Sequence, residues 1–227
     1  MVTRAGSTRT EGRTPLSRER VLTVAVALAD RDGIDGLSMR KLGQELGVDA
    51  MALYRHVKSK DDLLNAIVEM VVGEIERIEP DGPWKPALRG QVMAARRVML
   101  RHPWMRLVLE EQGTIGVAII GYVEGILAIL LEGGFTMDLA HHTLHVLGSR
   151  IFGFSQDLFD DSGKVEPSPE AAATIARAMA QYPRVAELAG SVSHEGVLGA
   201  CDDDVEFAFG LDLILDGLEQ LQRSSRR

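Results

Sequence analysis

Basic side chains stand in unusual places between residues 38 and 60, in a stretch that reads as two short helices joined at Gly47. Arg40 and Lys41 fall in the first turn of one helix, and Lys60 begins a later one. The partial positive charge of a helix N-terminus disfavours cations there by about 0.3–1 kcal/mol each. A phosphate group would offset that cost, and the free amides of a helix start bind phosphate as well. Solvated surface charge is the alternative interpretation, and the surrounding pattern favours phosphate.

A short helix expected at about 49–56 exposes a face that a small domain would normally bury or neutralise. Its apolar residues turn inward, which leaves outside Ala50, Met51, Tyr54, Arg55 and His56. Small residues let the helix backbone approach base edges, and a methionine can contact a thymine methyl. Arg55 can read guanine or hold a phosphate, and the Tyr54 hydroxyl and the His56 ring suit phosphate oxygens. A half-buried packing role is the alternative for Tyr54, and the two roles are compatible.

Apolar residues at helical spacing place this face on an all-helical scaffold. The first part of the chain predicts helices at about 17–31, 38–46, 49–56 and 59–78. Ser17, Ser38 and Ser59 suit the N-caps of three of them. Beyond a break at residues 80–83, helical patterns recur at about 85–101, 103–111, 114–132, 136–160, 168–181 and 202–222. Only 5% of residues are aromatic and alternating β-branched runs are scarce, so we predict an all-α fold of about nine to ten helices.

The formal net charge of −8 opposes DNA binding only when it is taken as a single number. Residues 1–60 hold 11 Lys and Arg against 7 Asp and Glu, whereas residues 61–227 hold 14 against 26. A basic part joined to an acidic body is typical of a nucleic-acid module attached to another domain. The charge distribution therefore supports a DNA-binding role for the first part of the chain.

Composition divides the chain into three expected parts: a flexible basic arm at 1–16, a DNA-binding domain at 17–78 and a second domain at 84–222. The beginning of the sequence has no apolar signal region, and a single cysteine, Cys201, excludes an internal disulfide framework. Both observations favour a cytoplasmic protein. The most apolar segment, 115–131, has Glu124 at its middle, which favours a buried helix over a membrane span.

Residues 17–78 resemble the DNA-binding domain of the tetracycline-repressor (TetR) family. The matching segments are 32–38 (DGIDGLS), 40–43 (RKLG), 46–48 (LGV), 53–57 (LYRHV) and 58–64 (KSKDDLL). Near the end of the chain, residues 207–212 (FAFGLD) and 215–218 (LDGL) resemble the last helix of the branch that contains the tetracycline repressor. The resemblance is specific in the N-terminal part and less so in the body.

The resemblance implies an all-helical, homodimeric repressor that binds a palindromic DNA operator and is released by a small, largely apolar molecule. By matching position it gives DNA-contact roles to Arg40, Ala50, Met51, Tyr54, His56 and Lys60. The arguments from residue chemistry add Ser38, Lys41 and Arg55 to this surface. Ala50 and Met51 replace a glutamine and a proline of the tetracycline repressor, so the resemblance does not say which DNA base sequence this chain reads. A transcriptional activator on the same fold is the alternative.

One recognition helix reads too few bases to be selective, so we expect a twofold dimer. Two helices offer apolar stripes with glycines that allow close approach, and we expect them to pair with their mates in a four-helix bundle. The expected interface residues are Leu147, Ile151, Phe154, Leu158, Phe207, Leu211, Ile214, Leu215 and Leu218. The alternative is that both stripes pack in the chain's own core.

A ligand pocket is expected where apolar walls carry sparse polar groups. The candidates are Met99, His102, Trp104, Leu107, Val117, Ile120, Glu124, His142, His145, Ser149 and Phe152. Core packing is the alternative for each of them. His145 with His141 or His142 is a possible metal-binding pair, but a tight site needs three or four ligands. We therefore expect no metal and no cofactor.

An all-helical enzyme with an incidental helix-turn-helix is the interpretation from another class. The sequence contains no nucleophile elbow, P-loop, metalloprotease motif or dinucleotide fingerprint. Glu124 near Tyr122 is the one acid–base candidate, and a single carboxylate is weak support for catalysis. We therefore expect a DNA-binding regulator and not an enzyme.

Overall fold

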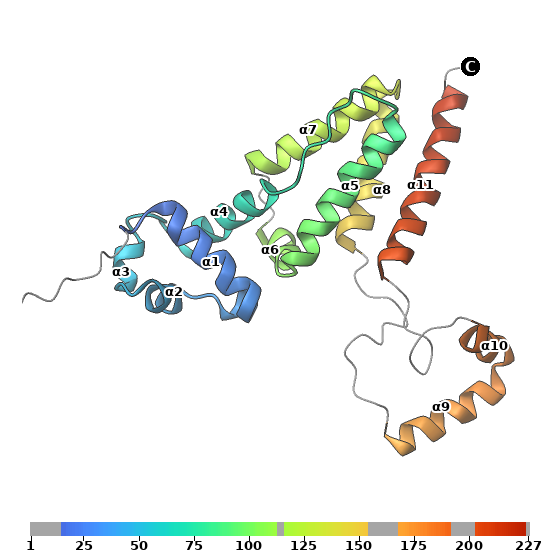
Figure 1. Cartoon of the computed structure of the whole chain (residues 1–227), viewed down its shortest axis with the longest axis horizontal. Helices are drawn as coiled ribbons and strands as arrows, with labels where there is room; N and C mark the ends of the chain where they lie inside the picture. The colour runs from blue at the N-terminus through green and yellow to red at the C-terminus, as the bar shows by residue number, and fades with distance from the viewer. Residues whose placement is uncertain (1–14, 113–115, 154–167, 192–202, 226–227) are drawn as a thin grey trace, which may run out of the picture. The chain divides into compact units, whose positions relative to one another are not determined.

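The computed structural model describes residues 15–112, 116–153, 168–191 and 203–225 (Figure 1). These residues form eleven α-helices and one short 3₁₀ turn (Ile34–Gly36), with no strand among them. The helices are α1 (Arg18–Asp32), α2 (Met39–Leu46), α3 (Ala50–Leu53), α4 (Lys60–Val72), α5 (Trp84–Arg101), α6 (Met105–Gln112), α7 (Val117–Glu132), α8 (Met137–Gly153), α9 (Pro169–Gln181), α10 (Pro183–Ser191) and α11 (Asp203–Ser225). The predicted all-α fold is confirmed.

Serine side chains begin three of the first four helices, as their positions predict. The Oγ atoms of Ser17, Ser38 and Ser59 each accept a hydrogen bond from the amide three residues later, at 3.2, 3.2 and 3.0 Å. Each bond satisfies an amide that the first helical turn leaves without a partner. Asp62, three residues after the Ser59 cap, accepts from the amide of Lys58 at 2.7 Å, one residue before that cap.

The first four helices pack around one apolar core. Each contributes a leucine that is at most 2% exposed: Leu28, Leu42, Leu53 and Leu63. Trp104 and Met105, at the start of α6, join the same core. Burying one such leucine is worth about 1.5–3 kcal/mol, so the core sets the position of the short α3 firmly.

The fourth helix is shorter than the predicted span of 59–78, because α4 ends at Val72. The buried side-chain amide of Gln91 holds the backbone that follows. Its Oε1 accepts from Ile78 N at 2.9 Å, and its Nε2 donates to Glu76 O at 3.2 Å. These two bonds give Ile78 N and Glu76 O partners outside a helix. The apolar spacing continues through the segment, which is why the sequence pattern did not mark the end.

Two later helices also differ from the predicted ranges. α8 is described as far as Gly153, and residues 154–160 of the predicted helix lie outside the described part. α10 has no counterpart among the predicted helices. Its first residue is Pro183, and a proline suits the first helical position because the amide it lacks would have no partner there. Pro183 was therefore a usable signal for this helix.

The chain divides into two compact units. One consists of Met1–Glu79 with Gly90–Ala128, and the other of Pro80–Arg89 with Ile129–Arg227. The domain boundaries expected from the sequence stay predictions, and the arm expected at 1–16 lies almost wholly outside the described residues. Among the described helices, none has both the length and the apolar character needed to cross a membrane.

The second unit includes a contact between α8 and α11. Basic residues at the start of α5 bind the flank of α11: Arg89 donates to Asp212 at 2.7 and 3.2 Å, and Lys85 pairs with Asp216. The hydrogen bonds from Arg89 lower the pKa of the Asp212 carboxyl. Exposed pairs of this kind are worth about 0–1 kcal/mol, so apolar packing dominates the stability of this unit.

Candidate nucleic-acid interface

A tight turn holds α3 against α2. Gly47, the expected joint between the two helices, ends α2 in the left-handed conformation (φ 64°, ψ 36°). Gly43 lies where the two helices meet, and a Cβ at this position would stand 2.9 Å from Val48 O and 3.2 Å from Ala50 N. The backbones approach this closely because residue 43 has no side chain. Residues 39–53 thus form a helix-turn-helix with α3 as its second helix.

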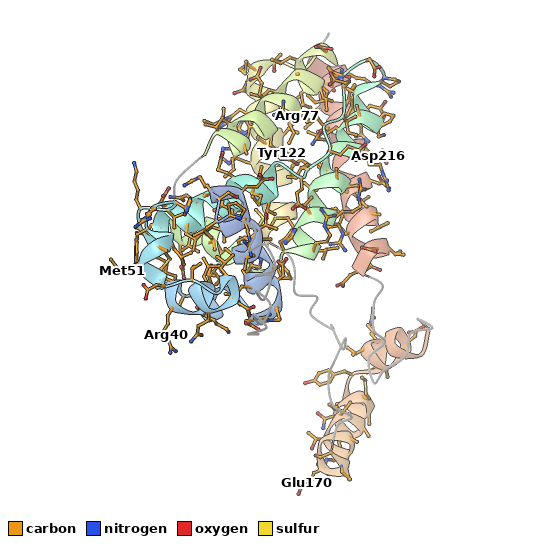
Figure 2. All side chains as sticks on the ribbon, turned by 60° about the vertical axis from the view of Figure 1, so that its left-hand side comes forward. Arg40, Met51, Arg77, Tyr122, Glu170 and Asp216 are labelled. Carbon is orange, nitrogen blue, oxygen red and sulfur yellow. The ribbon has the colours of Figure 1, made fainter. Side chains whose placement is uncertain are left out.

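The outward side of α3 carries the residues that the sequence predicts to face DNA. Met51 is 72% exposed and Tyr54 is 45% exposed, whereas Leu53 is fully buried. Figure 2 shows Met51 projecting outward from the ribbon. Within residues 50–56 only Leu53 is buried, and the exposed or half-buried residues are Ala50, Met51, Ala52, Tyr54, Arg55 and His56. The structure therefore presents this set on one surface, and its contacts with DNA stay a prediction.

Cations without ion pairs surround this helix. Within the described part of the chain, no ion pair is formed by Arg40, Arg55, Lys58 or Lys60. Lys41 differs, because its Nζ lies 2.6 Å from Asp32 Oδ2. Hydrogen bonds from Arg31 and from Lys41 lower the pKa of the Asp32 carboxyl to about 2. The unfavourable charge of Lys41 at the start of α2 is therefore offset inside the protein, whereas that of Arg40 is not.

Residues outside the predicted set hold the surface in place. Asp49 caps α3, because its Oδ1 accepts from Met51 N at 2.8 Å. Arg18 Nη1 donates to His56 O at 2.6 Å and ties the end of the helix-turn-helix to the start of α1. An acid directly before a helix is a recognisable cap signal. The Arg18 contact joins distant residues, so sequence spacing carries no sign of it.

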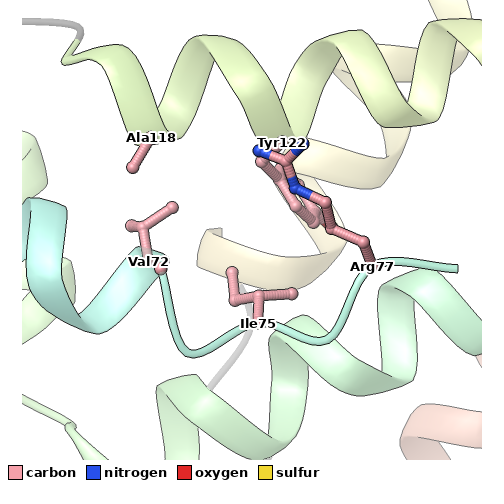
Figure 3. A pocket seen from close by; sticks show the side chains of 6 residues that line it. Val72, Ile75, Arg77, Ala118 and Tyr122 are labelled. Atoms are coloured by element: carbon pink, nitrogen blue, oxygen red, sulfur yellow. The ribbon is translucent and has the colours of Figure 1, made fainter.

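A small cavity lies in the same compact unit, at the other end of α4 from the helix-turn-helix. Its volume is about 70 Å³, and its lining residues are Val72, Gly73, Ile75, Arg77, Ala118 and Tyr122 (Figure 3). The Tyr122 hydroxyl is buried and has no hydrogen-bond partner within the described part of the chain. Burial raises the pKa of this phenol. One helix therefore runs from Lys60, beside the exposed α3, to Val72 at the cavity.

Two protein-family descriptions match the chain. Residues 21–67, which contain the helix-turn-helix, match "Bacterial regulatory proteins, tetR family". Residues 78–222 match "Tetracyclin repressor-like, C-terminal domain", and this match alone spans more than half of the chain. The chain belongs to the TetR family. It is a transcriptional regulator whose DNA binding resides in the helix-turn-helix.

Individual relatives agree with this assignment. The transcriptional repressor DrrR1 of Streptomyces coeruleorubidus is 28% identical over 218 residues, which are 93% of this chain and 80% of that protein. A possible TetR family regulator from Streptomyces coelicolor has 28% identity and a TM-score of 0.72, covering 90% of this chain and 100% of that one. ActR of Streptomyces coelicolor in complex with actinorhodin has 25% identity and a TM-score of 0.70, covering 90% and 95%. The names of these relatives describe a transcriptional repressor, a possible transcriptional regulator and a TetR family protein.

The ligand residues predicted for this TetR chain do not line the cavity at the end of α4. Met99 is half-buried against the core, and the side chain of Phe152 lies outside the described part. The exposed members of the set are Leu107, Val117, Ile120, Glu124, His142, His145 and Ser149. Arg77 and Tyr122, which do line the cavity, were absent from the predicted set. The predicted ligand residues therefore stay a prediction.

His102 and Trp104, also predicted as ligand residues, are buried and form a polar cluster with the more exposed carboxylates of Asp30 and Glu74. His102 Nδ1 lies 2.7 Å from Asp30 Oδ1, and its Nε2 lies 3.4 Å from Glu74 Oε2. Trp104 Nε1 donates to the same Asp30 oxygen at 2.6 Å. A hydrogen bond from Arg101, with a smaller one from His102, lowers the pKa of Glu74. The cluster joins α1 to the turn between α5 and α6.

The histidines of α8 form no multidentate site with the described residues. The rings of His141 and His145 meet edge to face with centroids 4.6 Å apart, and His142 lies 3.9 Å from Asp138. Within the described residues, no group of three or more His, Cys, Asp or Glu is placed to hold a metal ion. A pair of ligands alone binds metal weakly.

Most of the described residues predicted for the dimer interface are buried within the chain itself. These are Leu147, Phe207, Leu211, Leu215 and Leu218. Ile214 is half-buried, and the side chains of Ile151, Phe154 and Leu158 lie outside the described part. Their burial agrees with the alternative interpretation, packing in the chain's own core, and the expected interface residues stay a prediction. The apolar residues that α11 leaves exposed are Val205, Phe209, Leu213 and Leu221.

Proposed function

We propose that this chain is a ligand-responsive repressor: a homodimer that binds a palindromic operator and releases it when a small molecule binds. The observation that carries the proposal is the helix-turn-helix surface, where four cations that form no ion pair with any described residue lie on or near the exposed α3. Cations that neutralise phosphates release counterions, which supplies much of the affinity of a protein for DNA. The relation to the repressor DrrR1 supports repression over activation. The protein acts in the cytoplasm, where the chromosome lies.

Each residue of the surface takes a role that follows from its chemistry. Met51 at the start of α3 contacts base edges, where a thymine methyl is an apolar partner. Arg55 donates to guanine or to a phosphate, and Tyr54 donates to a phosphate. Arg40 and Lys60 lie at helix starts, where free amides add to the attraction for phosphate. Together these contacts divide into base reading by α3 and positioning by its surroundings.

A second copy of the chain supplies the other half of the recognition. Phe209, Leu213 and Leu221 of α11 are each more than half exposed, and Val205, Phe209 and Leu213 follow one another at a spacing of four residues. This spacing places them along one side of the helix. Association through this stripe buries apolar area that a monomer leaves in water. A twofold dimer then offers two α3 helices to half-sites about 34 Å apart.

The fourth helix offers a route from ligand to DNA. α4 begins at Lys60 on the helix-turn-helix side and ends at Val72 in the wall of the cavity. At about 1.5 Å per residue it is about 20 Å long. A ligand that favours a different position of the Val72 end shifts the whole helix, and with it Lys60. The response needs a ligand that binds the DNA-free arrangement more tightly than the DNA-bound one.

Fluorescence anisotropy with labelled DNA from the chain's own upstream region tests the proposal. We expect a dissociation constant of about 10⁻⁸–10⁻¹¹ M at physiological salt. Arg55→Ala should weaken binding by about 1–3 kcal/mol or relax the base preference. Arg184→Ala is the matched control, because Arg184 is an exposed arginine of α10. Unchanged affinity and unchanged base preference in Arg55→Ala would count against the reading role, and absence of binding to any upstream fragment against the function.

A further inference from the structure

Tyr122 carries a buried hydroxyl that the described part of the chain leaves without a hydrogen-bond partner. The residue lines the cavity between the end of α4 and α7 (Figure 3). A tyrosine phenol is protonated at neutral pH and can donate, and burial raises the pKa of this one further. A buried hydroxyl without a partner costs about 1–3 kcal/mol. An acceptor oxygen placed in the cavity would recover that cost.

Arg77 brings a positive charge to the same cavity. Its neighbours in sequence, Glu74 and Glu76, pair with other arginines at 2.8 and 3.8 Å. Arg77 itself has no ion pair within the described residues. Its Nη2 lies 2.8 Å from the place that a Cβ on residue 121 would take, so the guanidinium rests against the backbone of α7 at Gly121. Figure 3 shows it beside Tyr122, the other polar group of this wall.

The remaining walls of the cavity are mainly apolar. Val72, Ile75 and Ala118 contribute aliphatic side chains. Glu69 caps α7, because its Oε2 accepts from Ala118 N at 2.9 Å, whereas its buried Oε1 has no hydrogen-bond partner within the described residues. The positive end of a helix offsets a carboxylate in that position. Two donors, one of them charged, above an aliphatic surface are suited to a ligand that has an oxyanion on an apolar body.

We propose that this cavity binds a compact organic anion, an aromatic carboxylate or phenolate, whose oxygen accepts hydrogen bonds from Arg77 and Tyr122. The inference names the chemical class of the effector and rests on the proposed ligand response. The guanidinium selects the charge, the phenol adds a directed donor, and the aliphatic residues hold the ring. A neutral isostere lacks the charge-assisted bond and binds more weakly.

Ligand-observed NMR on the full chain tests the proposal, with benzoate as the anionic probe and benzamide as its neutral isostere. Benzoate should bind at least about tenfold more tightly than benzamide, and Arg77→Gln should weaken benzoate binding about tenfold. Tyr122→Phe should weaken it by about three- to tenfold. Arg184→Gln and Tyr182→Phe are the matched controls, because both residues are exposed and lie on other helices or turns. Both controls should bind benzoate like the unaltered chain.

Equal affinity for benzoate and benzamide, or full benzoate binding by Arg77→Gln, would overturn the proposal. So would the absence of benzoate binding to the unaltered chain. Thermal unfolding of each variant separates loss of the site from loss of the fold. Operator binding without benzoate is measured in parallel: a chain that binds its operator and ignores benzoate refutes this inference alone, whereas a chain that binds benzoate but no operator refutes the proposed function.

Discussion

Arg40 and Lys41 are adjacent cations in the first turn of α2 that have different surroundings. Lys41 Nζ lies 2.6 Å from Asp32, whereas Arg40 forms no ion pair with the described residues. We expect Arg40→Ala to reduce the slope of log affinity against log salt by about 1, and Lys41→Ala to reduce it less. Operator titrations between about 50 and 200 mM salt measure both slopes. Equal reductions would mean that the pair with Asp32 opens on DNA.

The buried hydroxyl of Tyr122 leads to a prediction about the stability of the ligand-free protein. Because its buried hydroxyl has no partner within the described residues, Tyr122→Phe should raise the free energy of unfolding by about 1 kcal/mol. For a chain of this size that corresponds to a rise of about 2–4 °C in the melting temperature. Tyr182→Phe, at a residue 60% exposed, should leave it unchanged. Destabilisation by Tyr122→Phe would reveal a partner for the hydroxyl and remove one argument for the anion site.

At the scale of single residues, the sequence predicts well what neighbouring residues decide. The caps at Ser38 and Ser59 and the left-handed Gly47 depend on residues at most four positions away, and all three are confirmed. The cavity brings Arg77 together with Tyr122 from a distant helix, so no local pattern could select them. The predicted ligand residues omitted both for this reason.

The helix-turn-helix depends on close packing between α2 and α3. Gly43→Ala would place a Cβ 2.9 Å from Val48 O and 3.2 Å from Ala50 N, which are backbone atoms that cannot rotate away. We expect a loss of about 1–3 kcal/mol in stability and weaker operator binding. Gly125→Ala in α7 is the control, because its Cβ meets nothing within 4 Å and should gain about 1 kcal/mol from helix propensity. Urea unfolding measures both, and similar effects would refute the packing argument.

Helix ends were harder to predict than helices. The apolar spacing of α4 continues past Val72. The side chain of Gln91, however, gives Glu76 O and Ile78 N hydrogen-bond partners in a backbone that is not helical. The apolar spacing of α4 carries no information about a glutamine on another helix. Whether a helix forms depends on the residues of that segment, so the sequence can predict it. The end of α4 depends on a tertiary contact, which the sequence of the segment does not contain.

The stripe on α11 predicts how whole chains associate. Leu213 is 57% exposed, and Leu213→Glu would place a charge in the apolar contact of the proposed dimer. We expect the unaltered chain to sediment as a dimer at micromolar concentration, and Leu213→Glu as a monomer with much weaker operator binding. Leu100→Glu, at an exposed leucine of α5, is the control and should remain dimeric. A dimeric Leu213→Glu would place the interface elsewhere.

Over the whole molecule, composition predicted the fold class and charge predicted where DNA binding lies. The same reasoning did not separate an interface from a core. Phe207, Leu211 and Leu215 form an apolar stripe that suits either role, and the structure buries them inside the chain. Both sides of α11 carry apolar residues. Its sequence therefore does not show which side packs against the neighbouring helices.

The cluster around Asp30 limits the exchange of the DNA-binding helices of this regulator for those of another, in evolution or by engineering. Asp30 belongs to α1, whereas His102 and Trp104 follow α5, yet the three side chains share hydrogen bonds. A chimera that took its first four helices from another regulator would leave an imidazole and an indole without their acceptor, unless the donor also had a carboxylate at this position. The DNA-reading helices are thus inherited together with residues far along the chain.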